Sequence, residues 1–468
     1  MAEENTTLVG EGQPVSNYIE VDAELLTDIL DLVRSNSRNL ILNILNDLYP
    51  ADIGHLINGM DFADGEYLFN LLAPDIGSQV ILELDESHRD HFLKTLSQIR
   101  LSELVEEMSS DDATDIVADL PKEKAREVLG NIDVAGSTQV QELLQYDEHT
   151  AGGIMQKEVI AVHKNDTVKK AIGTVRKFAK EHPSEHLYSI FVVDDDGIML
   201  GRLSIPTLVL ESPNRRLYKV METDVIVIKD DMDQEEVARV FKKYSAISLP
   251  VVGANGKLVG RITVDDVVNV LVEEHDEDVA KMIGSDAQEL ESRSPTQIAL
   301  MRLPWVLITL FIELLAGIVI HQFDKTLTQV LLLASFMPII SAISGNTGLQ
   351  SAAIIVRGLA TGHVDLKNWW LPTSRQLQTS VIIGGSCGLV IGIIAGLWHG
   401  GALFGFVVGF SMFVSVNISG FVGTTVPMIS KSLGYDPAIT AGPFETAFQD
   451  VVGISIFLGI ATILLQWL

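Results

Sequence analysis

Three carboxylic acids lie inside apolar stretches of this sequence, where an ionised side chain is costly. Asp450 and Glu445 belong to the last such stretch, and Glu313 lies in the middle of the first. A charge at the centre of a membrane-spanning helix costs about 2.5–3.5 kcal/mol on insertion scales, so such residues usually face a cavity or a partner. The alternative is a carboxyl group that is protonated or hydrogen-bonded for structural reasons. This alternative weighs most for Glu313, which has no polar neighbour close in sequence.

Five apolar stretches approach the ~20 residues that cross the hydrocarbon core of a bilayer. They cover residues 298–320, 327–345, 378–399, 402–428 and 438–467. The Lys and Arg residues at their ends fall on one side of this pattern, except for Lys325. Positive side chains stay on the cytoplasmic side. The sequence therefore predicts a multi-pass protein of the plasma (inner) membrane, with a cytoplasmic N-terminus and an extracytoplasmic C-terminus.

Polar and turn-forming residues interrupt the second, fourth and fifth stretches. They are Pro338 with the run 341–350, Asn417 with Pro427, and Pro443. Irregular backbone at membrane depth is tolerated only beside protein or a water-filled cavity. We therefore expect a water-filled pathway lined by amides, hydroxyls and carboxylates. Such a pathway suits a hard cation, and Mg²⁺ in particular keeps several waters while touching only one or two carboxylates.

Glycines recur at every fourth residue along the third and fourth stretches. They are Gly384, Gly388, Gly392 and Gly396, followed by Gly401, Gly405 and Gly409. Small residues let membrane helices approach closely, because lipid offers no hydrophobic drive between them. These stripes predict a tight helix bundle rather than chemistry.

Charge divides the chain into two parts. Residues 296–468 hold six acidic and six basic side chains, so the net charge of −29 belongs to the first 295 residues. Neither part is basic, which excludes a nucleic-acid binder of the usual kind. The single cysteine, Cys387, excludes a disulfide framework and a multi-cysteine zinc site. With no phosphate-cradling glycine loop, no nucleophile–base arrangement and no apolar leader in residues 1–20, we expect a non-enzymatic membrane protein with a large cytosolic front part.

Residues 130–284 contain an internal repeat of about 60 residues. Each copy reads as a strand, a helix, two strands joined by a glycine turn, and a helix. The segments are 159–162, 190–193 and 201–204 in the first copy, and 225–228, 249–252 and 260–263 in the second. This order and period resemble a tandem pair of cystathionine-β-synthase (CBS) domains.

The CBS resemblance implies an adenine-nucleotide site, with ATP as a regulator. In the family, a Gly-x-x-Ser/Thr-x-x-Asp run follows the last strand, and its Asp holds the ribose. The second copy keeps this run as Gly260, Thr263 and Asp266, whereas the first has Pro206 and Thr207 at the end of it. Because one copy departs, we weigh simple structural pairing above nucleotide binding.

Residues 20–130 show no strand pattern. Turn signals recur about every dozen residues, at Pro50, Asp61, Pro74, Asp85, Ser97, Ser109 and Pro121. The segments between them have helical apolar spacing, which predicts short stacked helices in a small α-solenoid. We expect residues 1–18 to be a disordered tail.

Acidic clusters punctuate the front part of the chain. They are Asp111, Asp112 and Asp115; Asp230, Asp231, Asp233, Glu235 and Glu236; Asp265 and Asp266; and Glu273, Glu274, Asp276, Glu277 and Asp278. Any one of them can be a solvated face or a helix N-terminus. However, two carboxylates about 4 Å apart repel by roughly 4 kcal/mol at an effective dielectric constant of 20. Divalent cations would relieve that repulsion and favour the compact arrangement, so the clusters predict a cation sensor.

The order of these parts resembles the MgtE-type magnesium channels over nearly the whole chain. The membrane motifs that carry the resemblance are Gly345-Asn346-Thr347-Gly348-x-Gln350-Ser351, Arg357-x-Leu359-Ala360-Thr361-Gly362, Asp436-Pro437-Ala438, Gly442-Pro443 and Asp450-Val451-x-Gly453. The implied fold is a multidomain membrane protein with an N-terminal α-solenoid, a tandem α/β CBS pair and a five-helix transmembrane domain. Its parts are an acidic helical domain at 19–130, the CBS pair at 131–265, a connecting or plug helix at 266–295 and the membrane domain at 296–468.

The resemblance further implies a homodimer in the lipid bilayer, with the two copies of Asp450 meeting on one pore. Magnesium between the helical domain, the CBS pair and the plug would lock the closed state. The matching metal positions are Asp111, Asp112, Asp115, Asp233, Glu235, Asp266, Glu274, Glu277, Asp278 and Asp436, and Glu445 is an additional carboxylate near the pore. Departures from the family pattern are Gln79, Ser245 and Asn269 in place of acids, and Gly442 where some members have Asn.

The sequence as a whole predicts a passive, Mg²⁺-selective channel for magnesium uptake, closed by cytosolic Mg²⁺. One alternative is a transporter of another divalent cation, such as Co²⁺ or Mn²⁺, or an ion-coupled carrier. Another is a membrane-anchored nucleotide-sensing CBS module whose spans merely anchor it. Asp450 argues against a plain anchor, which has no need of an acid inside the bilayer.

Overall fold

The structure is a computed structural model that describes residues 23–182, 187–289, 294–399 and 401–464. The predicted disordered tail at residues 1–18 lies outside these ranges. The chain folds as two compact units. One comprises Met1–Asp231 and Pro250–Arg261, and the other comprises Met232–Leu249 and Ile262–Leu468.

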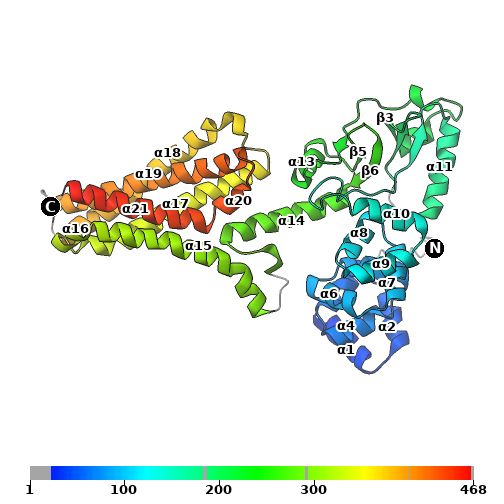
Figure 1. Ribbon diagram of the computed structural model, residues 1–468, viewed down its shortest axis with the longest axis horizontal. Coiled ribbons are helices and arrows are strands. Elements are labelled where there is room, and N and C mark those ends of the chain that lie inside the picture. The colour runs from blue at the N-terminus through cyan, green and yellow to red at the C-terminus, as the bar shows by residue number, and fades with distance from the viewer. Residues whose placement is uncertain (1–22, 183–186, 290–293, 400, 465–468) are drawn as a thin grey trace, which may run out of the picture. The chain divides into compact units, whose positions relative to one another are not determined.

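Short helices fill the N-terminal part of the first unit (Figure 1). Within the described residues 23–143 they are α1 (Ala23–Arg34), α2 (Arg38–Leu45), α3 (Pro50–Asn58), α4 (Phe62–Phe69), α5 (Pro74–Leu82), α6 (Glu86–Thr95), α7 (Gln98–Glu106), α8 (Ser110–Ala118), α9 (Lys122–Asn131) and α10 (Val134–Leu143). Their apolar faces share one core, which includes Ile57, Phe69, Phe92 and Leu104.

The predicted turn residues are the N-terminal signals of these helices. Pro50 and Pro74 are the first helical residues of α3 and α5, where the missing proline N–H costs nothing. The Asp85 side chain accepts a hydrogen bond from the backbone N of His88, 2.7 Å away, and so caps α6. Ser97 caps α7 in the same way. The prediction of a small helical solenoid is confirmed.

Two three-stranded sheets follow, as the repeat predicts. The first has the order β1 (Ala161–His163), β2 (Ser189–Val193), β3 (Met199–Ser204), and the second β4 (Ile228–Lys229), β5 (Ser248–Val252), β6 (Leu258–Thr263). β1 pairs with β2 in parallel and β2 with β3 in antiparallel fashion, while β4 pairs with β5 in parallel. The helices α11 (Val168–Glu181), α12 (Ile205–Leu210) and α13 (Gln234–Tyr244) accompany these strands.

The connecting segment begins as a long helix, α14 (Val264–Ile283), in the second unit. A capping box between Thr263 and Asp266 starts it, which satisfies two backbone donors that would otherwise be unpaired. Gly284 ends it with a φ of 74°, the left-handed conformation that terminates many helices.

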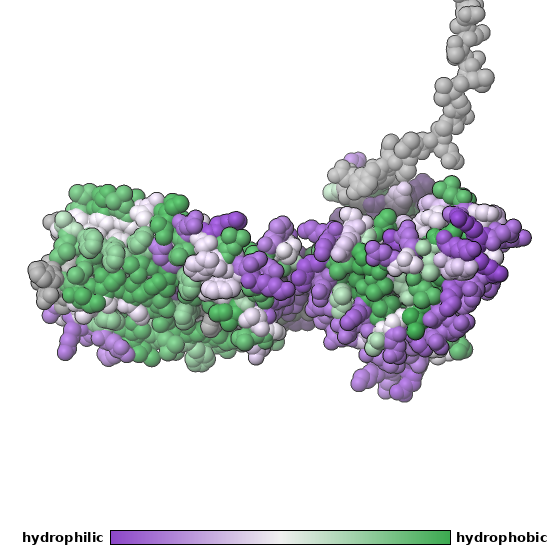
Figure 2. Space-filling view, turned by 90° about the horizontal axis from the view of Figure 1, so that it is seen from above, coloured by the Kyte–Doolittle hydropathy of each residue, from purple (hydrophilic) through white to green (hydrophobic). Residues whose placement is uncertain are grey.

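Five helices of the described chain are long and apolar enough to cross a membrane. They are α15 (Pro295–Gln322), α17 (Leu333–Ala360), α18 (Trp370–His399), α19 (Ala402–Ser432) and the pair formed by α20 (Pro437–Thr440) and α21 (Pro443–Ile463); the short α16 (Asp324–Gln329) follows α15. Figure 2 shows an apolar outer surface over the part of the molecule that holds them.

The predicted interruptions in the second and fourth spans are wrong. α17 runs through Pro338, and α19 runs through Asn417 and Pro427. Side chains such as Ser344 and Asn417 bond to backbone carbonyls one turn earlier, at 2.8 and 2.7 Å, so they fit within a helix. Neighbouring helices can offset the hydrogen bond that a proline removes. Among the spans as far as the structure describes them, the fifth alone is broken, because α20 ends at Thr440 and α21 begins at Pro443.

The glycine stripes pack α18 directly against α19. A Cβ added at Gly388 would lie 2.6 Å from the carbonyl oxygen of Gly409, and one added at Gly392 would lie 2.9 Å from that of Gly405. The two backbones therefore approach as closely as glycine permits, as the spacing predicts.

Candidate functional site

A cluster of polar side chains lies among the membrane-spanning helices, around Asp450. The hydroxyl group of Ser341 on α17 donates a hydrogen bond to Oδ1 of Asp450 on α21. The carboxyl group of Glu313 on α15 lies near enough to Asp450 for the two groups to interact. Asp450 remains partly exposed, whereas Ser341 is buried. The arrangement gathers two carboxyl groups and a hydroxyl group from three helices, which are oxygen ligands of the kind a hard cation prefers.

Glu445 points into the protein instead. Its side chain is 1% exposed, and its Oε1 accepts a hydrogen bond of 3.0 Å from Nε2 of Gln449. A Cβ added at Gly348 would lie 2.6 Å from both Oε1 of Glu445 and Oγ of Ser419. Five residues along a helix turn two side chains about 140° apart, so Glu445 and Asp450 face different surroundings. The structure thus brings Asp450 together with Glu313, and it leaves Glu445 buried between α17, α19 and α21.

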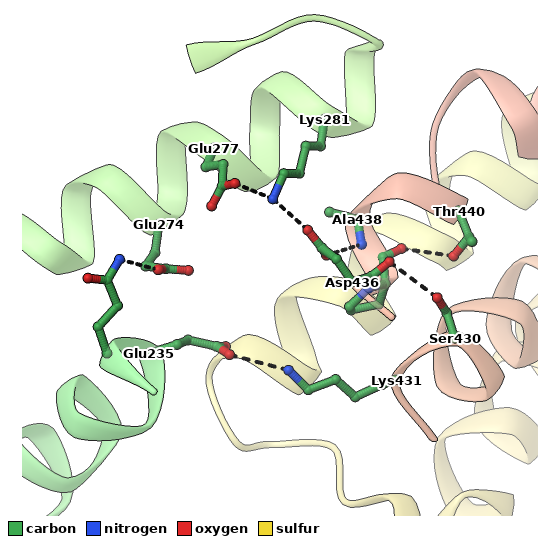
Figure 3. A network of polar contacts seen from close by, with 11 residues as sticks. Glu235, Glu274, Glu277, Lys281, Ser430, Lys431, Asp436, Ala438 and Thr440 are labelled. Atoms are coloured by element: carbon green, nitrogen blue, oxygen red, sulfur yellow. Dashed lines mark hydrogen bonds and ion pairs between the residues drawn. The ribbon is translucent and has the colours of Figure 1, made fainter. Parts of the chain in front are cut away.

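A second cluster lies where α14 meets α20, at the end of the membrane domain that leads to the soluble part (Figure 3). Asp436 caps α20, and its Oδ1 accepts a hydrogen bond of 2.8 Å from the backbone N of Ala438. Its other oxygen, Oδ2, accepts from Nζ of Lys281 on α14, at 2.7 Å. The same ammonium group pairs with Glu277, one helical turn earlier. Lys281 therefore joins two carboxylates that come from different elements.

Further acids surround this contact within the second unit. Glu235 on α13 pairs with Lys431, 3.4 Å away, and Glu274 on α14 accepts a hydrogen bond of 2.7 Å from Gln234. Burial, reinforced by the charge of Asp436 and then by those of Glu235 and Glu274, raises the pKa of Asp278 to about 6. Burial also raises the pKa of Glu274. These shifts mean that burial first, and the neighbouring acids second, make negative charge unfavourable at this contact.

Two of the remaining predicted metal positions, Asp233 and Asp112, accept local hydrogen bonds in the structure. Asp233 caps α13 by accepting a hydrogen bond of 2.9 Å from the backbone N of Glu235. Asp112 accepts one of 2.6 Å from the Ser109 hydroxyl, at the start of α8. Asp111 and Asp115 share α8 with Asp112 in the first unit. Among the described residues, no three His, Cys, Asp or Glu side chains are already grouped closely enough to hold a metal ion.

The three predicted nucleotide-binding residues also hold the local fold. A Cβ added at Gly260 would lie 2.7 Å from the carbonyl oxygen of Gln156, so this glycine permits close backbone pairing. The Thr263 hydroxyl donates to Oδ2 of Asp266 at 2.6 Å, within the capping box of α14. These contacts account for the motif without a bound nucleotide.

Sequence reasoning missed the partners that these acids find in the fold. It named Glu313 as an isolated acid, because its partner Asp450 lies on a different span. It did not consider Lys281. A lysine four residues after Glu277 indicates no more than an ordinary ion pair along one helix. Only the fold reveals that Asp436 completes that pair.

Similar proteins identify the family of this chain. The magnesium transporter MgtE of Bacillus subtilis is 32% identical over 94% of this chain and 97% of its own length. The chain belongs to the MgtE family. The MgtE proteins of Thermus thermophilus and Enterococcus faecalis are 31% and 27% identical, over 95% and 94% of this chain and 100% and 97% of their own lengths. None of these names describes a catalytic activity.

The parts of this MgtE-family chain match separate domain families. Residues 337–460 match MgtE, a divalent cation transporter domain, and residues 48–149 match the MgtE intracellular N domain. Residues 151–211 and 217–273 each match a CBS domain. A solved cytosolic domain of the Mg²⁺ channel MgtE, in complex with ATP, is 32% identical and covers 52% of this chain and 99% of its own, with a TM-score of 0.49. The predicted family and the CBS pair are therefore confirmed.

Proposed function

We propose that this protein carries Mg²⁺ passively across the plasma membrane, through a pathway that passes Asp450. The relatives named magnesium transporters support the choice of ion. The observation that carries the proposal is the group formed by Asp450, Ser341 and Glu313 among three membrane helices. Their oxygens can accept hydrogen bonds from the waters that Mg²⁺ retains, so the ion need not be stripped of its hydration shell.

The proposed protein works as a homodimer, in which two copies of Asp450 face one pore. The partial exposure of Asp450 supports this arrangement, because two such carboxylates, one from each chain, balance the charge of a dication. The N-terminus lies in the cytoplasm and the C-terminus outside, in keeping with the positive residues at one set of helix ends. Glu445 then supports the helix packing and does not touch the ion.

Cytosolic Mg²⁺ closes the proposed pore by neutralising crowded acids. In the second unit these acids are Glu235, Glu274, Glu277, Asp278 and Asp436. The raised pKa of Asp278 supports this role, because a site that disfavours negative charge gains stability from a cation. The acids of α8 and the capping residues Asp233 and Asp266 belong to the same proposed sensor. When Mg²⁺ leaves, their repulsion separates the elements and opens the pore.

ATP is proposed only as a regulator of the CBS pair, through Gly260, Thr263 and Asp266. Equilibrium dialysis of the full-length protein over a series of ATP concentrations measures ATP binding. Saturable binding that Asp266→Asn weakens supports the role, and binding unchanged by that substitution removes it.

Ion selectivity in proteoliposomes tests the transport proposal. We expect faster entry of Mg²⁺ than of Co²⁺ or Mn²⁺ at equal concentration, and Mg²⁺ entry that persists in Glu445→Gln. Ser341→Ala should slow entry, since it removes one of the groups around Asp450. Preference for Co²⁺ or Mn²⁺ would transfer the proposal to that ion, and the absence of any flux from a folded protein would contradict it.

A further inference from the structure

Lys281 lies between two carboxylates that belong to different elements of the fold (Figure 3). Its Nζ is 2.7 Å from Oδ2 of Asp436, a residue 155 positions further along the chain, and it also pairs with Glu277. The side chains of Lys281 and Asp436 are only 26% and 28% exposed. Their interaction is therefore screened less by water than that of a typical surface ion pair.

The geometry fixes Asp436 for this contact. Oδ1 of Asp436 is occupied by the backbone N of Ala438, at 2.8 Å, and its backbone carbonyl accepts a hydrogen bond of 3.2 Å from the Ser430 hydroxyl. Only Oδ2 is directed to Lys281. Because the carboxylate is held by its own loop, the ammonium group ties α14 to the start of α20 rather than to a mobile side chain.

Ammonium groups of the chain itself thus meet three of the acids at this contact, since Lys281 pairs with Glu277 and Asp436, and Lys431 pairs with Glu235 in the same unit. An ammonium group is a compact positive charge with three donors. It can therefore neutralise part of the repulsion that would otherwise separate α14 from α20 when no divalent ion is present.

We propose that Lys281 is a built-in cation that limits how far α14 moves away from α20 when Mg²⁺ is absent, and that a divalent ion must displace its ammonium group to bind Glu277 and Asp436. This inference rests on the proposed gating by Mg²⁺ and adds a residue to it. The exchange replaces one positive charge by two, so it strengthens the contact without creating it. Lys281 is thus a positioning residue of the gate, and it sets how far the pore opens when Mg²⁺ is removed.

We call the contact of Lys281 with Glu277 and Asp436 the clamp. Distance measurements on the full-length protein test the clamp independently of transport. Spin labels would be placed at Val279 on α14 and Ile439 near the end of α20, both exposed, in a Cys387→Ser background. Labelled chains would be diluted with unlabelled chains, so that only distances within one chain are read. In EDTA we expect a single narrow distance distribution for the parent protein, with a mean moderately longer than in Mg²⁺. Lys281→Gln should broaden it and lengthen its mean, Lys281→Arg should preserve it, and added Mg²⁺ should restore it in Lys281→Gln.

A flux measurement then connects the clamp to the pore. With EDTA on the cytosolic face, Lys281→Gln should raise Mg²⁺ entry at least threefold, whereas Lys281→Arg should stay within twofold of the parent. Lys242→Gln on α13 is the matched control, because its ammonium has no acidic partner within 4 Å in the part of the chain that the structure describes. An unchanged distance distribution for Lys281→Gln overturns the clamp. A changed distribution without any Mg²⁺ flux in the parent protein overturns the proposed function and leaves the clamp standing.

Discussion

Gly442 is the position where the end of α14 meets the start of the last membrane helix. A Cβ added there would overlap the carbonyl oxygen of Met282. It would also lie 2.9 Å from the carbonyl carbon of Met282 and 3.2 Å from the carbonyl oxygen of Lys281. All three atoms belong to the backbone of α14, so no side chain can rotate to make room. We predict that Gly442→Ala excludes α14 from its present position and leaves the proposed pore open.

The size of the effect follows from the steric conflict. Overpacking a closely packed contact costs typically about 1–3 kcal/mol. The cost applies only to the state in which α14 rests on Gly442, because the open state has no such contact. A bias of this size changes the ratio of closed to open protein by about 5- to 150-fold. Residual flux at saturating cytosolic Mg²⁺ should therefore rise by the same factor.

The assay is Mg²⁺ entry into proteoliposomes, with the cytosolic face held at high Mg²⁺. Gly459→Ala on the same helix is the control, because among the described residues its added Cβ would meet no atom within 4 Å apart from its chain neighbours and the nearby backbone of its own helix. It should close like the parent protein. If Gly442→Ala also closes fully, α14 does not rest on Gly442 in the closed state, and the reasoning fails.

Three further predictions concern helix packing, capping and pH. Gly388→Ala should lower the thermal midpoint of unfolding in detergent by several degrees, because its Cβ would lie 2.6 Å from a facing carbonyl oxygen. Gly385→Ala is the control and should leave the midpoint unchanged. Among the described residues its Cβ would meet no atom of a neighbouring helix within 4 Å. Asp85→Ala should destabilise α6 by about 1–2 kcal/mol, measured by hydrogen exchange, because the helix loses its N-cap. Asp90→Ala removes only an exposed ion pair and should cost less than about 0.5 kcal/mol. Asp278 has a pKa of about 6 where α14 meets α20, above its ordinary 3.8, so this state binds more protons and is strengthened as pH falls through 6. With no Mg²⁺ on the cytosolic face, Mg²⁺ entry should therefore be slower at pH 5.5 than at pH 7.5. Entry through Asp278→Asn should be slow at both pH values. Equal entry at the two pH values in the parent protein would contradict this.

Local signals were enough to predict much of the fold. Pro50, Asp85 and Ser97 mark helix starts because proline and short polar side chains satisfy the first backbone donors of a helix. The glycine stripes likewise predict the close contact of α18 with α19. These features depend on neighbours within a few residues, or on a repeat along one helix, and both are visible in the sequence.

Features that depend on distant partners could not be predicted. The break expected at Pro338 is missing, because hydroxyl groups on α17 bond within their own helix. Glu313 gained a partner only when α15 and α21 packed together. The sequence around Lys281 indicates only an ion pair along one helix, and the fold places Asp436 beside it. In each case the deciding contact joins residues far apart in sequence.

The most direct test of the proposed function is Mg²⁺ entry through the parent protein and through Asp450→Asn, each with the cytosolic face at low and then at high Mg²⁺. Asparagine keeps the size of the side chain and removes its charge. The proposal predicts rapid entry at low cytosolic Mg²⁺, closure at high Mg²⁺, and a loss of at least tenfold in Asp450→Asn at low Mg²⁺. Entry that is unchanged in Asp450→Asn, or that ignores cytosolic Mg²⁺, would contradict it.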